Sequence, residues 1–137
     1  MEKEFRVSTS ALGAGLDALE AALREAHLPN ADVLDLRCAA EEVLTNVAKY
    51  GHEDDRGEHQ VRMRLAIGPG EATLVFADNG RPFDPTAAPP LDLGESDRPI
   101  GGLGIHLTLA LMDRAEYARV GDENVLTLRK RLGPAVA

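Results

Sequence analysis

Alternation of apolar and polar residues marks two stretches of the chain as hairpins. In "QVRMRLAI" (60–67) every second residue is apolar, "GPGE" supplies a turn, and "ATLVFAD" (72–78) is the returning strand. A second pair, "AEYARV" (115–120) and "NVLTLRKRL" (124–132), is joined around "GDEN". Period-two alternation of this kind predicts strands that bury one face. "EFRVS" (4–8) reads as a short first strand.

Helical spacing of apolar residues predicts two longer helices between the first strand and the first hairpin. One runs from about residue 11 to 27, and the second begins near Asn30, a good N-cap residue with Asp32 in the first turn. Gly51 is expected to end the second helix, and a short helix is expected at about 103–112. The predicted core stripes are Leu12, Leu16, Leu19 and Leu23 in the first helix, and Val33, Leu36, Ala40, Val43, Leu44 and Val47 in the second.

These elements predict an α+β fold, a two-layer sandwich with helices on one face of an antiparallel or mixed sheet of four to five strands. The whole chain, 1–137, is expected to form one domain. The stretch 79–101 is irregular and holds five of the eight prolines. Connections of this length are uncommon in small domains and are often functional, so a lid over a site is expected.

Composition narrows the classes of function. The chain has 23 acidic and 15 basic residues, a formal charge of −8, which argues against nonspecific binding to nucleic acid. A single cysteine excludes an internal disulfide and suits a reducing compartment. No run approaches the roughly 20 apolar residues of a membrane span, and the N-terminus lacks a signal-peptide pattern. A cytoplasmic protein without a membrane partner is expected.

Two polar residues interrupt the apolar pattern of the second helix. In "CAAEEVLTNVAKYG" (38–51), Glu42 and Asn46 are one turn apart and flank the apolar stripe, with Glu41 on the other flank. An asparagine oxygen suits Mg²⁺, and a nearby carboxylate can accept a proton from an attacking hydroxyl. The alternative is that both are merely polar residues at a solvated helix edge.

Two further motifs are candidates for ligand contacts. In "FADNGRPFDP" (76–85), Asp78 ends a strand, where its carboxylate can accept a hydrogen bond from an exocyclic amine, and Gly80 lets the backbone approach a flat ring. The alternative is a plain Asp-Asn-Gly turn. In "IGGLGIHL" (100–107), glycines precede a helix, which suits anion binding by backbone N–H groups. The alternative there is a flexible hinge.

In this order the three motifs resemble the GHKL ATP-binding fold of gyrase, heat-shock chaperone, histidine kinase and mismatch-repair ATPases. Within it the chain resembles the anti-sigma factor serine kinases of bacterial partner-switching systems. The resemblance implies ATP and Mg²⁺ as cofactors, Glu42 as general base and Asn46 as the Mg²⁺ ligand. It also implies nucleotide contacts from residues of all three motifs: Asn46, Lys49, Asp78, Gly80, Gly101, Gly102, Leu103 and Gly104.

Several positions depart from the family pattern. Tyr50 stands where relatives often have histidine, and Ile100 where some have arginine. Arg98 is an alternative candidate for contact with the γ-phosphate. A last-strand residue often lies near adenine, and here both Asn124 and Thr127 are candidates. These departures weaken the case for catalysis more than the case for ATP binding.

The leading hypothesis is an ATP-dependent serine kinase that phosphorylates an antagonist protein and sequesters a sigma factor, as a homodimer. The resemblance supplies these partners. One alternative is a noncatalytic nucleotide-binding switch that works by competitive protein binding. Another is a stand-alone ATPase coupled to dimer closure.

Overall fold

The alternating segments form five strands in the computed structural model, which describes residues 1–50, 59–87 and 110–134. Along the chain the elements are β1 (Glu2–Ser8), α1 (Leu12–Glu25), α2 (Asn30–Tyr50), β2 (Gln60–Gly68), β3 (Glu71–Asp78), the 3₁₀ helix η1 (Pro85–Ala87), β4 (Arg114–Val120) and β5 (Glu123–Arg131).

The strands form one sheet in the order β1-β2-β3-β5-β4, and every neighbouring pair is antiparallel. The predicted sheet of four or five strands is confirmed, and the antiparallel alternative is the right one. Both predicted hairpins are present. Each turns through a glycine with positive φ, Gly70 at 74° and Gly121 at 60°, a conformation that residues with a Cβ rarely adopt.

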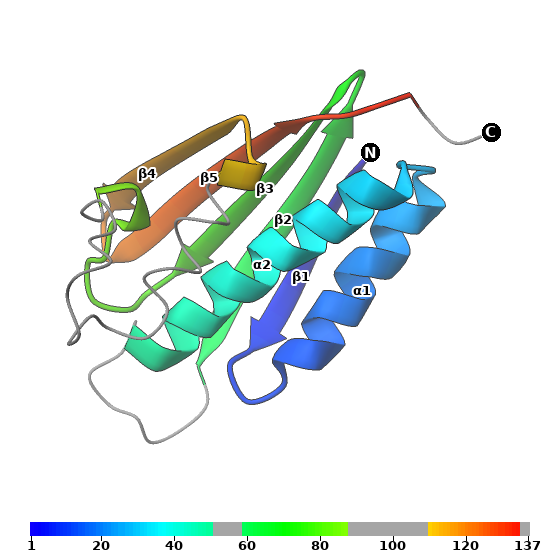
Figure 1. The fold of residues 1–137 in the computed structure, drawn as a ribbon. Helices are drawn as coiled ribbons and strands as arrows, with labels where there is room; N and C mark the ends of the chain where they lie inside the picture. Colours follow the sequence, from blue (N-terminus) through cyan, green and yellow to red (C-terminus); the bar gives the residue numbers. More distant parts are fainter. Residues whose placement is uncertain (51–58, 88–109, 135–137) are drawn as a thin grey trace, which may run out of the picture.

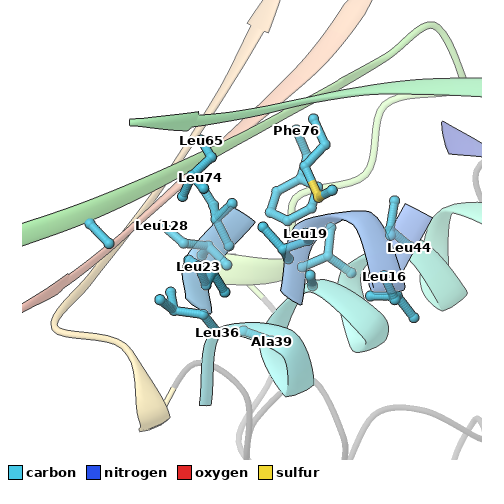
Figure 2. Packing of buried hydrophobic residues seen from close by; sticks show 14 of the residues in the cluster. Leu16, Leu19, Leu23, Leu36, Ala39, Leu44, Leu65, Leu74, Phe76 and Leu128 are labelled. Carbon is cyan, nitrogen blue, oxygen red and sulfur yellow. The ribbon is translucent and has the colours of Figure 1, made fainter. Parts of the chain in front are cut away.

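Both helices cover the same face of the sheet and lie side by side (Figure 1). Their apolar stripes meet the inward side chains of the strands, and Figure 2 shows Phe76 and Leu74 of the sheet close to Leu19 and Leu23 of α1. Of the predicted stripe residues, all are buried except Leu12 and Val47, which are half-buried. The two-layer prediction is therefore confirmed.

The helix boundaries differ slightly from those predicted. α1 ends at Glu25, and His27 just beyond it has a positive φ of 63°, so the chain leaves the helical conformation earlier than expected. Asn30 is the first residue of α2 rather than its cap, and its Oδ1 accepts a hydrogen bond from Arg24 at 3.1 Å.

Some predicted features lie outside the described residues. These are Gly51, most of the proline-rich stretch and most of the short helix, of which Ala110 and Leu111 are described and helical. Within the described parts of the chain, no helix is both long enough and apolar enough to cross a membrane.

Two glycines of α1 offer a matched test of the packing between α1 and β1. A Cβ on Gly15 would lie 2.8 Å from both methyl carbons of Val7, whereas a Cβ on Gly13 would meet nothing within 4 Å. We expect Gly15→Ala to lower the free energy of unfolding by about 1–3 kcal/mol because of overpacking. Gly13→Ala is expected to raise it by about 0.5–1 kcal/mol, since alanine favours the helix. Urea unfolding of the two variants measures both effects, and equal signs would contradict the packing described.

Candidate functional site

A small cavity lies where α2 meets β3, β5 and β4. Its volume is about 30 Å³, enough for about two water molecules. Among the described residues three polar or charged side chains are buried, each 6% exposed, and all three line this cavity: Asn46, Asp78 and Asn124. The lining residues are Val43, Asn46, Val47, Phe76, Asp78, Phe83, Pro85, Tyr117, Asn124 and Leu126.

On α2, the side chain of Asn46 is hydrogen-bonded to Glu42. Asn46 Nδ2 donates to the main-chain carbonyl of Glu42 at 2.8 Å and to its Oε1 at 3.3 Å. Bonding to the carbonyl four residues back satisfies a polar side chain that otherwise competes with the helix. Within the described residues, Asn46 Oδ1 and Glu42 Oε2 have no hydrogen-bond partner. The pair thus presents one neutral oxygen in a cavity and one carboxylate oxygen on a half-buried side chain beside it.

At the end of β3, Asp78 is both a turn residue and a buried carboxylate. Its Oδ1 accepts hydrogen bonds from the Gly80 N–H at 2.9 Å and from Asn124 Nδ2 at 3.2 Å. The bond to Gly80 closes the Asp-Asn-Gly turn that was the alternative interpretation of this motif. Asp78 Oδ2 has no partner in the part of the chain that the structure describes. A buried acceptor without a donor is costly, so this oxygen favours a ligand that donates.

The sheet register separates the two last-strand candidates. Asn124 pairs with Asp78 across β3 and β5 and shares its face, so it lies in the cavity wall. Thr127 pairs with Val75, and its neighbours Leu126 and Leu128 point into the core. Successive side chains of a strand point to opposite faces, so Thr127 lies on the open face, away from the cavity.

Of the other predicted site residues, the two that the structure describes do not line the cavity. Gly80 is buried in the turn after Asp78. Lys49 is exposed in the last turn of α2. The glycine segment (Gly101, Gly102, Leu103 and Gly104) lies outside the described residues, as do Arg98 and Ile100.

Sequence reasoning missed three residues of the cavity wall. Phe83 and Pro85 follow the turn after β3, and Tyr117 projects from β4. Tyr117 lies on the same face of β4 as Ala115, and both are half-buried. Its closeness to Asp78 depends on the order of the strands, which alternation does not reveal.

Comparison with known proteins identifies the class. Residues 5–130 match the histidine kinase-like ATPase domain, and the chain belongs to that family. It is 32% identical over 101 residues to the serine/threonine-protein kinase BtrW of Bordetella bronchiseptica, covering 72% of this chain and 70% of BtrW. It is 28% identical over 88 residues to the serine-protein kinase RsbW of Bacillus cereus, covering 60% of this chain and 54% of RsbW.

Solved structures agree on the fold. A structure of the RsbU and RsbW domains of Rv1364c from Mycobacterium tuberculosis superposes with a TM-score of 0.70 at 18% identity. That match covers 99% of this chain but only 34% of the mycobacterial chain. The Acinetobacter baumannii histidine kinase AdeS gives a TM-score of 0.50 at 14% identity, over 96% of this chain and 68% of AdeS. The predicted GHKL-type fold is thereby confirmed.

Proposed function

We propose that this protein is an ATP-dependent serine kinase. One observation carries the proposal: Asn46 and Asp78, far apart in the sequence, line one cavity and each has a side-chain oxygen without a partner among the described residues. A cation and an amine are the groups that these two oxygens suit. The family and the serine kinases BtrW and RsbW support ATP as the ligand and serine as the acceptor.

The adenine base is proposed to enter the cavity beside Asp78. Asp78 Oδ2 accepts a hydrogen bond from the exocyclic amine, and the apolar walls from Phe76 and Leu126 lie against the ring. Phe83, which is 43% exposed and belongs to neither a strand nor a helix, lines the same cavity.

The donor set also fits Mg²⁺. Among the described residues no group of three or more His, Cys, Asp or Glu is placed to hold a metal ion. Mg²⁺ commonly takes one or two protein oxygens and fills its shell with phosphates and water. Asn46 Oδ1 would be such a ligand, and the bound ion would neutralise charge on the phosphate oxygens. Lys49 and the Gly101–Gly104 segment are proposed to contact the phosphates.

Glu42 is proposed as the general base. It accepts the proton of the serine hydroxyl while the serine oxygen bonds to the γ-phosphorus and the bond from γ-phosphorus to the bridging oxygen breaks. ADP is the leaving group. Glu42 Oε2, which has no partner among the described residues, can take that proton, and the hydrogen bond from Asn46 to Oε1 orients the carboxylate.

We further propose that the phosphorylated protein is an antagonist of the kinase's second partner, a sigma factor, and that the kinase acts as a cytoplasmic homodimer. Phosphorylation adds a charge of about −2 to the antagonist. This chain is itself acidic, with a formal charge of −8, so added negative charge weakens the complex. The antagonist then leaves, and the kinase is free to hold the sigma factor.

Incubation with a serine-bearing antagonist and γ-labelled ATP tests the proposal. The label is expected to move to serine in a reaction that requires Mg²⁺ and stops when the metal is chelated. An antagonist with alanine in place of that serine is the control for nonspecific labelling. Absence of transfer at every Mg²⁺ concentration would overturn the kinase assignment.

A further inference from the structure

The side chain of Asn124 makes four hydrogen bonds, more than any other described side chain of the cavity wall. Its Nδ2 donates to Asp78 Oδ1 at 3.2 Å and to the Arg81 carbonyl at 2.8 Å. Its Oδ1 accepts from the Phe83 N–H at 3.3 Å and from the Tyr117 hydroxyl at 2.5 Å. An asparagine amide has two donor hydrogens and two acceptor sites, so every one is used. Asn124 therefore has no polar group left to contact a base.

The partners fix which way the amide faces. The Phe83 N–H can only donate, while the Arg81 carbonyl and the Asp78 carboxylate can only accept. A flipped amide would place its oxygen against two acceptors and its nitrogen against a donor. The hydroxyl of Tyr117 adds a second donor on the oxygen side. The orientation shown is thus the one that satisfies the network.

The same network ties the turn after β3 to the strands. Asn124 holds both Arg81 and Phe83, and Arg119 of β4 donates to the Gly80 carbonyl at 2.7 Å. The carboxylate of Asp78 is therefore held from two sides on Oδ1, by the turn and by β5. Considering the described residues alone, Oδ2 is the oxygen of Asp78 that remains for a ligand.

We propose that Asn124 is a positioning residue that sets the base specificity of the site. Tyr117 orients Asn124, and Asn124 holds the Asp78 carboxylate so that Oδ2, a hydrogen-bond acceptor, faces the ligand. The inference rests on the proposed function, since it concerns the same nucleotide site. A rigid acceptor at this point favours a 6-amino purine, which donates, over a 6-oxo purine, which presents an oxygen to it. The side chain acts on the base through Asp78 and does not touch it.

Calorimetry with ATP, ADP and the 6-oxo nucleotide ITP tests this role. In Asn124→Ala we expect the affinities for ATP and ADP to fall by the same factor, about tenfold, because both share the base contact. The preference for ATP over ITP is expected to shrink by a similar factor. Tyr117→Phe removes one hydroxyl, so we expect the affinities for ATP and ADP and the preference for ATP over ITP to fall by about threefold.

Thr127→Val is the matched control, because Thr127 is on the same strand but on the open face. We expect wild-type affinities and wild-type preference for ATP in that variant. A merely structural role for Asn124 would lower the melting temperature without changing the ratio of ATP to ITP affinity, and that result would overturn the inference. Should Asn124→Ala fail to fold, an unchanged ratio in Tyr117→Phe would overturn it equally.

The outcomes separate this inference from the proposed function. If the wild-type protein binds no ATP, both fail. If the wild type binds ATP with a preference over ITP, and that preference survives intact in Asn124→Ala and Tyr117→Phe, the proposed function stands and the role of Asn124 fails.

Discussion

Replacement of Glu42 by glutamine is expected to slow phosphoryl transfer by about 10²–10⁴-fold, the usual contribution of a general base. Glutamine keeps an oxygen that can accept the hydrogen bond now made by Asn46 Nδ2 to Oε1 at 3.3 Å, so the site keeps its shape. The substitution replaces Oε2 by an amide nitrogen that takes up no proton near neutral pH. Affinity for ATP should change by less than about threefold, because Glu42 does not line the base cavity.

The measurement is the initial rate of serine phosphorylation at saturating ATP, with the dissociation constant of ATP determined by calorimetry on the same samples. Glu41→Gln is the matched control: it removes the same charge from the neighbouring residue, which is exposed. A general effect of charge on the negatively charged nucleotide would appear in both variants. A full rate in Glu42→Gln would remove Glu42 from catalysis. Unchanged partner exchange in that variant would favour a noncatalytic switch.

Much of the fold could be predicted because burial follows simple periods. In β2 the apolar residues recur at every second position, and this placed Met63 on the buried face, where the structure also has it. The same alternation also separates the two last-strand candidates, Asn124 and Thr127, between which the sequence analysis did not choose. Thr127 lies between Leu126 and Leu128, so it must face away from them, whereas Asn124 shares their face.

The strand order could not be predicted in this way. Alternation shows which face of a strand is buried but not which strand lies next to it. The structure inserts β5 between β3 and β4, and this brings Asn124 of β5 beside Asp78 of β3 and within reach of Tyr117 of β4. The hydrogen-bond network of the cavity wall is therefore a product of topology. Phe83 was missed for a different reason, since the irregular segment that carries it has no period to interpret.

The helix motif was open to prediction because its signal is local. Glu42 and Asn46 are four residues apart, so one helical turn brings them together whatever the rest of the fold does. Their bond of 3.3 Å confirms the contact and leaves their chemical roles as proposals. The nucleotide contacts proposed for the glycine segment depend instead on where a long connection is folded, which no local period determines.

Replacement of Asp78 by asparagine is expected to lower the affinity for ATP by about 100-fold. The hydrogen bond between adenine and a charged carboxylate is lost, and the new amide N–H group faces the exocyclic amine, which is also a donor. The Gly80 N–H and Asn124 Nδ2 both need an acceptor, so the oxygen of Asn at position 78 stays with them. Its nitrogen then takes the place of Oδ2 and points a donor at the exocyclic amine of adenine. The 6-oxo nucleotide ITP presents an acceptor there, so its affinity should fall much less, and the preference for ATP should be lost or reversed.

Calorimetric titration of ATP and ITP measures this change, and thermal unfolding shows whether the variant keeps its fold. Asp84→Asn is the control, because it removes the same charge from the same connection. Within the described residues the Asp84 side chain hydrogen-bonds only to Thr86 and does not line the cavity. Loss of a negative charge near a polyanion raises affinity slightly in both variants, so a fall confined to Asp78→Asn isolates the hydrogen bond. Equal losses for ATP and ITP would mean that the carboxylate supports the site without reading the base. Unchanged binding of ATP would remove Asp78 from the nucleotide site.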